Sequence, residues 1–333
     1  MQPTLKEIAK ELGVSTATVS NVLSGKGRVS EETRKLVSDK IQEVGYRPGG
    51  PGRALRTGRS GVLGLVLPDI SNPLFPAFAQ SIETAAERSG QGILIADSHA
   101  DPSAQAEALQ RMIQRGADGI IIVPCRGTQV SDLTLPVVVI DSASTLGNCV
   151  CSNHNEGGQK AVRHLLDLGH RKIVLLGQSR RSSVQSDRIA GMNAALGSGE
   201  QAETYWLEDG APDFAEIARG GTTAIIATSD LYALTALTRL QDAGFSVPGD
   251  VSVLGFDDLS FSGRITPGLT TIAQNMPEIA TLAVKHLLLQ LERAPLPSER
   301  LVPMELVVRS STGPAPNTRR TKRPSPQQGD LKT

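Results

Sequence analysis

The chain has 333 residues, 39% of them hydrophobic and 20% charged, and its 34 basic and 34 acidic side chains leave no net charge. No run of about 20 apolar residues occurs, which excludes a membrane-spanning helix. The first 13 residues lack an apolar signal core and the three cysteines cannot form an even disulfide framework, so we expect a cytoplasmic protein.

The charges are unevenly distributed along the chain. Residues 1–60 hold 11 Lys or Arg against 6 Asp or Glu, a net charge of +5, whereas residues 61–317 hold 18 against 27, a net charge of −9. Residues 318–333 hold 5 against 1, a net charge of +4. A basic head on an acidic body predicts that the head binds a polyanion such as DNA and that the body does not.

The first helix is expected directly after Thr4. Thr4 and Glu7 have the spacing of a capping box, and apolar residues recur at helical spacing from Leu5 to Leu12. Gly13 then provides a helix stop, because glycine readily adopts the left-handed conformation.

A second and a third helix follow. Ser15 is expected to cap residues 16–23, and Ser30 to cap a helix that ends at Gly45. Helix, three-residue turn and helix is the arrangement that places the second helix in the major groove of DNA. Small three-helix units also bind proteins, but the basic excess and the polar residues at the start of the second helix favour DNA.

From residue 62 onward, short apolar runs alternate with helical periods, which predicts parallel sheets covered by helices on both faces. Two such series predict two lobes. In the first we expect strands at 62–67, 92–96, 120–123 and 137–140 and helices at 77–88 and 103–115. In the second we expect helices at 156–168, 187–196 and 231–243 and strands at 173–176, 223–227 and 251–256, with 302–309 as the last strand.

Polar residues follow several of these strands, where open parallel sheets bind their ligands. They are Asp69, Asn72, Phe75, Ser98, Asp141, Ser229, Asp230, Asp257 and Asp258. Helix capping explains Asn72, Ser229 and Asp230 equally well. The sequence contains no nucleophile elbow, Walker loop, dinucleotide fingerprint or metal-ligand spacing, so we expect no enzyme, cofactor or metal.

Several motifs together resemble the lactose-repressor (LacI/GalR) family. The first lies at residues 14–23, VSTATVSNVL, and is followed by Val29-Ser30, Thr33-Arg34 and Gly45-Tyr46-Arg47-Pro48. Further matches occur at 68–73, 168–173, 247–258 and 269–272. The resemblance implies a helix-turn-helix head at 1–47, a hinge at 48–60, a periplasmic-binding-protein-like body of two parallel-sheet α/β lobes at 61–313 and a disordered basic tail at 314–333.

The resemblance also implies DNA-binding positions. In that family the start of the second helix reads base edges, and a hinge helix inserts a leucine, here Leu55, into the minor groove. Residues 49–59, GGPGRALRTGR, would form this helix poorly alone, and a plain flexible linker is the alternative. The expected DNA-binding residues are Thr4, Ser15, Thr16, Ala17, Thr18, Ser20, Asn21, Arg28, Arg53 and Leu55.

Asn21 departs from the family pattern, which usually has arginine there. Arginine pairs with guanine and asparagine suits adenine, so we hypothesise a different operator half-site.

In relatives a small effector lies between the lobes. The positions implied here are Asp69, Asn72, Phe75, Arg188, Ser229 and Asp257. An arginine and an aspartate facing one cleft can bind vicinal hydroxyls or anionic groups, although Arg188 could instead be a helix-surface charge. His154 departs from the family pattern and is either structural or a source of pH sensitivity. A sugar or sugar derivative is expected, with a sugar phosphate, a nucleobase or no effector as alternatives.

No apolar heptad helix of the tetramer-forming kind ends the chain, so a homodimer on a palindromic operator is expected. An exported binding protein would share the body but lack the head. Activation instead of repression, or control by a partner protein, stays open.

Overall fold

The protein is described by a computed structural model over residues 4–24, 27, 29–44, 59–128, 130, 133–143, 149–298 and 300–316. The chain divides into two compact units, Met1–Gly61 and Val62–Thr333. Among the helices of the described residues, none combines the length and apolarity needed to cross a lipid bilayer.

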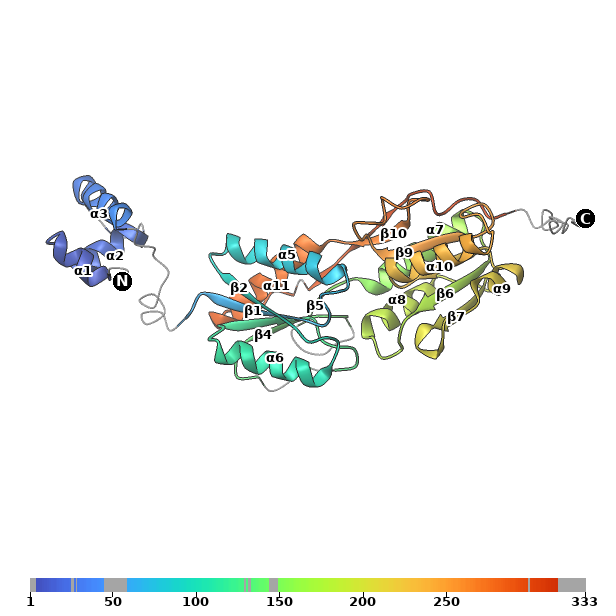
Figure 1. The fold of residues 1–333 in the computed structure, drawn as a ribbon, viewed down its shortest axis with the longest axis horizontal. Coiled ribbons are helices and arrows are strands. Elements are labelled where there is room, and N and C mark those ends of the chain that lie inside the picture. The colour runs from blue at the N-terminus through green and yellow to red at the C-terminus, as the bar shows by residue number, and fades with distance from the viewer. Residues whose placement is uncertain are drawn as a thin grey trace, which may run out of the picture. The chain divides into compact units, whose positions relative to one another are not determined.

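The described residues of the N-terminal unit form three helices, α1 (Leu5–Glu11), α2 (Thr16–Ser24) and α3 (Glu31–Glu43) (Figure 1). They enclose a small core of Ile8, Ala9, Val19 and Val37. The three predicted helices are therefore confirmed, each with its end within one or two residues of the expected place.

The predicted caps of this unit are present. Thr4 accepts from the backbone nitrogen of Glu7 at 3.3 Å, and Glu7 accepts in return from the backbone of Thr4 at 2.7 Å. Ser30 caps α3. Gly13 has a φ of +65°, and the nitrogen of Val14 donates to the carbonyl of Ala9 at 3.0 Å, a Schellman ending that turns the chain from α1 into α2.

The first lobe of the larger unit holds, in the described residues, a six-stranded sheet in the order β11-β5-β4-β3-β1-β2, all paired in parallel. Its strands are β1 (Val62–Leu67), β2 (Gly92–Asp97), β3 (Gly119–Ile122), β4 (Val137–Ile140), β5 (Cys149–Ser152) and β11 (Leu301–Val302). Helices α5 (Leu74–Arg88) and α11 (Met276–Leu291) cover one face and α6 (Pro102–Gln114) covers the other (Figure 1).

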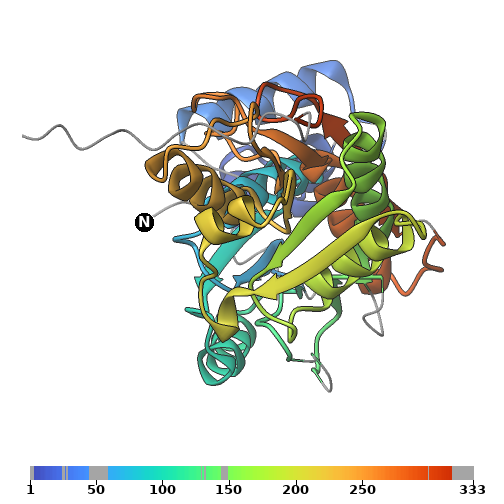
Figure 2. The ribbon, with the colours of Figure 1, turned by 90° about the vertical axis from the view of Figure 1, so that its right-hand side faces the viewer.

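The second lobe has the sheet order β12-β10-β9-β8-β6-β7 in the described residues. Its strands are β6 (Lys172–Gly177), β7 (Gln201–Trp206), β8 (Ala224–Ala227), β9 (Ser252–Asp257), β10 (Thr270–Gln274) and β12 (Met304–Val307). Helices α7 (His154–Asp167) and α8 (Ser183–Ala194) cover one face, and α9 (Phe214–Arg219) and α10 (Asp230–Asp242) cover the other (Figure 2). A short 3-10 turn, Leu207–Asp209, follows β7.

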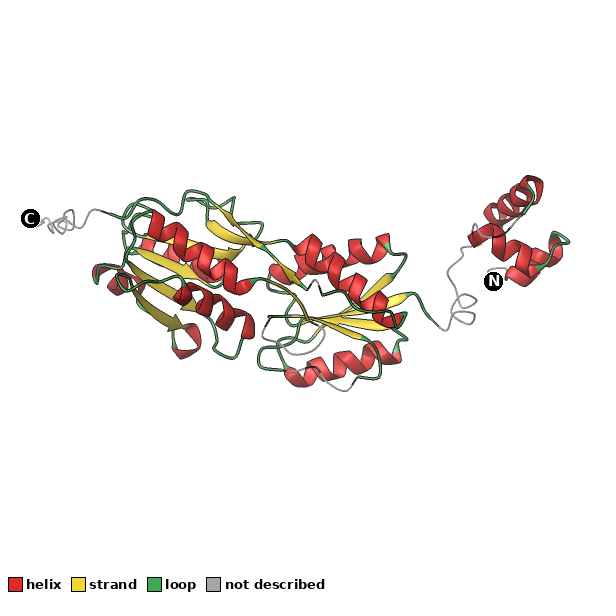
Figure 3. Ribbon diagram, turned by 180° about the vertical axis from the view of Figure 1, so that it is seen from behind, coloured by secondary structure: helices red, strands yellow, loops and turns green. Residues whose placement is uncertain are grey.

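The chain passes between the lobes three times, after β5, after β10 and between β11 and β12. Strands lie inside each lobe and helices outside (Figure 3). The expected single last strand at 302–309 is wrong. Val302 belongs to the first-lobe sheet and Met304–Val307 pairs antiparallel with β10, because the chain changes lobes at Pro303, which has no N–H to donate to a ladder.

Other differences from the predicted elements are omissions. β5, β7, α9, β10 and α11 were not predicted from the sequence, and α5 and α8 begin three and four residues earlier than expected. Cys125 and Cys151 are buried. At the C-terminal end of the body, the nitrogen of Ala315 donates to the carbonyl of Leu168 at 2.9 Å, and residues 317–333 of the predicted tail lie outside the described residues.

Candidate DNA-binding surface and effector site

The start of α2 carries the residues expected to meet DNA. The side chain of Ser15 accepts from the nitrogen of Thr18 at 3.0 Å and so caps the helix. Thr16 and Ala17 are exposed, whereas Val19 is buried in the core of the head. The helix therefore turns one face inward and presents its first turn outward, as base readout requires.

Some of the remaining predicted DNA-binding residues lie in the described part of the head and others do not. Ser20 and Asn21 are half-buried, and a Cβ on Gly27 would lie 3.0 Å from Nδ2 of Asn21, which places that side chain against the residue-27 turn. Thr4 is exposed at the cap of α1. Arg28, Arg53 and Leu55, with nearly all of the hinge, lie outside the described residues.

The second lobe brings Arg188 and Asp257 together. Nη2 of Arg188 donates to Oδ1 of Asp257 at 2.8 Å, and their side chains are only 3% and 2% exposed. Nη1 of Arg188 also donates to the carbonyl of Thr228 at 2.6 Å. Arg188 is thus not the helix-surface charge of the alternative interpretation, because α8 turns it inward across the ends of β8 and β9.

The α8 helix is fixed to this edge of the sheet by a second inward residue. Oε1 of Gln185 accepts from the nitrogen of Gln178 at 2.6 Å and from the hydroxyl of Thr228 at 3.2 Å. Gln178 and Thr228 directly follow β6 and β8, so α8 lies across the carboxyl ends of these strands, where parallel sheets bind ligands.

Asp257 has an unusual backbone conformation. Its φ is +103° and that of Asp258 is +51°, values that cost energy in residues other than glycine. Nε2 of Gln274 donates to Oδ1 of Asp257 at 2.8 Å, and Nη2 of Arg309 donates to Oδ1 of Asp258 at 2.6 Å. The strained turn after β9 is therefore held by side chains from β10 and from the C-terminal segment.

Asp230 is the buried support beneath this turn. Its carboxylate accepts from the nitrogen of Leu259 at 2.8 Å and from the hydroxyls of Ser262 and Thr271 at 2.6 Å each. Burial, followed by the nearby charge of Asp257, raises the pKa of Asp230 to about 7. Asp230 is therefore a buried structural residue that holds the turn after β9 in place.

Ser229 and Asn72 both contact the start of a helix. The hydroxyl of Ser229 accepts from the nitrogen of Leu231 at 3.4 Å, and Oδ1 of Asn72 accepts from the nitrogen of Leu74 at 3.1 Å. These contacts are the ones expected from the capping alternative. An effector role for either residue stays a prediction.

In the first lobe, Asp69 closes the turn after β1. Its Oδ1 accepts from the nitrogen and the hydroxyl of Ser71 at 2.9 and 2.6 Å, and the Ser71 hydroxyl is the main cause that lowers the pKa of Asp69. The charge of Arg126 lowers this pKa further, so Asp69 lies within electrostatic reach of Arg126. Phe75 is partly buried and packs against the first-lobe core.

Several side-chain contacts join the two lobes. Nη2 of Arg126 donates to the hydroxyl of Tyr232 at 3.3 Å. The hydroxyl of Ser183 donates to both carboxylate oxygens of Asp141 at 3.0 and 2.9 Å, and the hydroxyl of Ser142 donates to Asp187. The N-terminal parts of α8 and α10 therefore contact first-lobe residues that follow β3 and β4.

His154 joins Arg188 to the first lobe. It is the first residue of α7 and is fully buried; its Nε2 lies 3.3 Å from the carbonyl of Asp141, and its Nδ1 lies 3.3 Å from Nε of Arg188. Burial, reinforced by the charge of Arg188, lowers the pKa of His154 well below its ordinary value. His154 is therefore neutral near pH 7.

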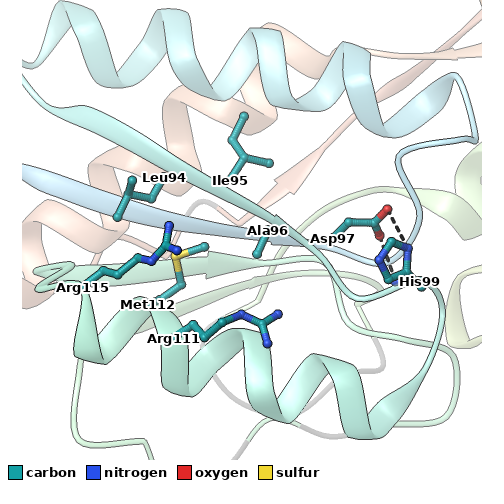
Figure 4. A pocket seen from close by; sticks show the side chains of 8 residues that line it. All are labelled: Leu94, Ile95, Ala96, Asp97, His99, Arg111, Met112 and Arg115. Carbon is teal, nitrogen blue, oxygen red and sulfur yellow. Dashed lines mark hydrogen bonds and ion pairs between the residues drawn. The ribbon is translucent and has the colours of Figure 1, made fainter.

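A hollow of about 270 Å³ lies elsewhere, between β2 and α6 (Figure 4). Leu94 and Met112 line it, and Arg111 and Arg115 stand along its helix side, while Asp97 pairs with His99 at 3.2 Å. None of the predicted effector residues lines this hollow. Within the described ranges, no three His, Cys, Asp or Glu side chains are grouped so that they could hold a metal ion.

Four residues around the Arg188–Asp257 pair were not predicted from the sequence: Arg126, Gln185, Thr228 and Gln274. Arg126 and Thr228 follow β3 and β8 within a few residues, and proximity to a strand end was the signal that could have found them. Gln185 and Gln274 were not accessible in this way, because their roles depend on the direction in which a helix and an edge strand present their side chains.

A helix-turn-helix head on a periplasmic-binding-protein-like body defines a class of DNA-binding regulators, and comparisons with known proteins agree with it. Residues 4–49 match bacterial regulatory proteins of the lacI family, and residues 162–312 match the periplasmic binding protein-like domain. The chain belongs to the lacI family of bacterial regulatory proteins.

The similarity extends over nearly the whole chain. The HTH-type transcriptional regulator reg1 of Streptomyces lividans is 34% identical, over 96% of this chain and 99% of its own. The ribose operon repressor of Halalkalibacterium halodurans is 30% identical, over 93% and 97%. The structure of the lac repressor dimer bound to operator and an anti-inducer matches with a TM-score of 0.76 at 25% identity, covering 94% of this chain and 100% of that one. The predicted family and fold class are thereby confirmed.

Proposed function

We propose that this protein is a cytoplasmic transcription repressor, not an enzyme, whose affinity for a palindromic operator is controlled by a sugar or sugar derivative bound between the lobes. The observation that carries the effector part is the buried Arg188–Asp257 pair at the carboxyl edge of the second-lobe sheet. Its relatives include a repressor of a ribose operon, which supports a sugar-responsive role.

The pair retains hydrogen-bonding capacity for a ligand. Arg188 has five N–H groups and donates one each from Nε, Nη1 and Nη2 to the protein, which leaves one on each Nη. Both protein donors to Asp257 use Oδ1, so Oδ2 can accept from a ligand. Because the two charges already compensate each other, the pair suits a neutral molecule with adjacent hydroxyls, one accepting from Arg188 and one donating to Asp257.

The proposed effector site also includes first-lobe residues. Asp69, Asn72 and Phe75 follow β1, and Asp69 is coupled electrostatically to Arg126, which contacts Tyr232 of the second lobe. A ligand held by both lobes stabilises one relative position of the lobes, and through the hinge it changes operator affinity. This coupling is reciprocal, so DNA changes the ligand affinity by the same factor.

The effector is sought by thermal shift of the full chain against a panel of monosaccharides and disaccharides, because a ligand of the folded state raises its melting temperature. Asp257→Asn keeps the side-chain size and should abolish the shift. Arg180→Met, which changes an exposed arginine beside Trp206, is the matched control and should retain it. An equal shift in wild type and Asp257→Asn would reject the effector site.

Operator binding is tested by selection from random duplexes with the full chain. We expect enrichment of a palindrome, and Asn21→Arg should enrich a different half-site. Leu55→Ala should weaken binding to the selected duplex far more than to random DNA. Failure to prefer any duplex over random competitor would overturn the assignment of the head.

A further inference from the structure

The imidazole of His154 bridges the two lobes through the effector arginine. It follows the first passage of the chain between the lobes, from β5 to α7. One ring nitrogen contacts the backbone of Asp141 at the end of β4 in the first lobe, and the other contacts Arg188 on α8 in the second lobe.

Chemistry fixes the tautomer of this histidine. Nε of Arg188 can only donate, so Nδ1 of His154 must accept, and the carbonyl of Asp141 can only accept, so Nε2 must carry the proton. Protonation of Nδ1 would bring two N–H donors and two positive charges face to face at 3.3 Å. The two contacts therefore coexist only while His154 is neutral.

The charged groups on the elements around His154 are consistent with a neutral imidazole. Arg188 and Asp187 come from α8, Asp257 from β9 and Asp141 from the end of β4. Asp257 is paired with Arg188, Asp187 accepts from Ser142, and the carboxylate of Asp141 accepts from Ser183. Each carboxylate has its own partner, and the lowered pKa of His154 follows from burial and from the charge of Arg188.

Backbone packing holds His154 and Arg188 in register. A Cβ on Gly158 of α7 would collide with the backbone carbonyl of Arg188, and one on Gly191 of α8 would collide with the carbonyl of Asn155, next to His154. The two helices therefore approach more closely than any other residue would allow at these positions. This contact fixes where His154 stands, and the imidazole then fixes how the guanidinium is turned.

We infer that His154 is a positioning residue, which links Arg188 to the first lobe and sets the orientation of the guanidinium toward Asp257. When His154 is protonated, both the link and the orientation are lost. The inference rests on the proposed function only in that Arg188 is also the proposed effector contact. Acidification would then separate the effector arginine from the first lobe without any ligand.

The test is proton–nitrogen NMR of the full chain, labelled at arginine and histidine and measured without ligand. The Nε–H signal of Arg188 is assigned by its loss in Arg188→Lys. His154→Phe removes both hydrogen bonds, whereas His154→Gln can still accept from Arg188 and donate to Asp141 but cannot titrate. His164→Gln changes another histidine of α7, which contacts Thr312, and is the matched control.

In wild type we expect His154 as the Nε2–H tautomer and slow exchange of the Arg188 Nε–H with water. Exchange should be about tenfold faster in His154→Phe and nearly unchanged in His154→Gln and His164→Gln. The wild-type signal should disappear on acidification together with protonation of His154, and that of His154→Gln should persist.

Three results would overturn the inference. One is the opposite tautomer. Another is a His154 that titrates near 6.5 while the Arg188 signal stays unchanged, and the third is unchanged exchange in a folded His154→Phe. If His154→Phe does not fold, the acid titrations of wild type and His154→Gln decide. Because no ligand is used, these results are independent of the sugar screen, which alone tests the effector assignment.

Discussion

The guanidinium carbon of Arg188 lies 4.7 Å from the centre of the Phe256 ring, so the arginine rests on the side chain that directly precedes its carboxylate partner. This stacking predicts a coupling between the two residues. Phe256→Leu and Arg188→Met should lower the free energy of unfolding non-additively, with a coupling of about 0.5–2 kcal/mol. Urea unfolding of the two single variants and the double variant measures it, and strict additivity would contradict the contact.

Breaking the buried ion pair of Arg188 and Asp257 should strongly lower the free energy of unfolding. Asp257→Ala leaves the guanidinium of Arg188 buried without its carboxylate, and we expect the free energy of unfolding to fall by about 3–5 kcal/mol. Asp209→Ala breaks the exposed pair with Arg180, which water screens, and it should lower the free energy of unfolding far less. Equal losses in urea unfolding would show that Arg188 is compensated by other groups.

Asp230 should give the protein a specific pH dependence. The folded protein holds this proton up to about pH 7, whereas the ordinary pKa is 3.8, so the contribution of Asp230 to stability is complete below pH 3.8 and is lost as the pH rises to about 7. Asp230→Asn should remove this slope. Asp242→Asn changes an exposed residue of the same helix and should keep it.

The measurement for Asp230 is the free energy of unfolding of each variant from pH 4 to 8. The variants must be compared with each other because His154 changes the stability with pH in the opposite direction. Since the pKa of His154 is lowered, its contribution to stability is complete above pH 6.5 and diminishes as the pH falls below that value. A slope that survives in Asp230→Asn would be inconsistent with the raised pKa.

The stability of the N-terminal head should depend on the residues that cap its helices. Ser30→Ala removes the hydroxyl that accepts from the nitrogen of Thr33, and it should cost about 1 kcal/mol of head stability. Calorimetry of the full chain, together with affinity for the selected operator, reports the loss. Ser38→Ala replaces an exposed serine inside α3 and should cause none, because alanine is the better helix former.

The first-lobe edge strand should take part in the proposed homodimer. Ile95 of β2 is 52% exposed, and its strand is at an edge of the sheet that no other described strand pairs, a combination that soluble proteins usually cover. Ile95→Lys should shift the protein toward monomer in sedimentation equilibrium and reduce operator affinity. Val308→Lys, which changes an equally exposed residue of the second lobe, should leave the assembly intact.

The sequence predicted the elements with a strong period and missed those without one. Val62–Leu67 and Val137–Ile140 were located to the residue, because a continuous apolar run is typical of a strand buried on both faces. The strand Gln201–Trp206 was missed since it lies at the sheet edge and reads QAETYW, with too few apolar residues to stand out. Met276–Leu291 was missed because its apolar residues, which include the run 287–289, are not confined to one face and so give a weak helical period.

The candidate site was predicted only in part. Arg188 and Asp257 were named together, and the structure pairs them at 2.8 Å. Their separation of 69 residues hides the contact from any local pattern, and only the resemblance connected them. The roles of Gln274 and Gln185 depend on which way β10 and α8 face, which no spacing rule states.

The late position of α11 has a consequence for biosynthesis. Ile279, Ala283 and Leu287 cover the same face of the first-lobe sheet as residues made some 200 positions earlier, such as Leu65. While the ribosome is still translating the second lobe, only α5 can cover that face, and the nascent chain must keep the part reserved for α11 from aggregating. The second lobe can therefore acquire most of its core before the first lobe, which is synthesised earlier, receives its last covering helix.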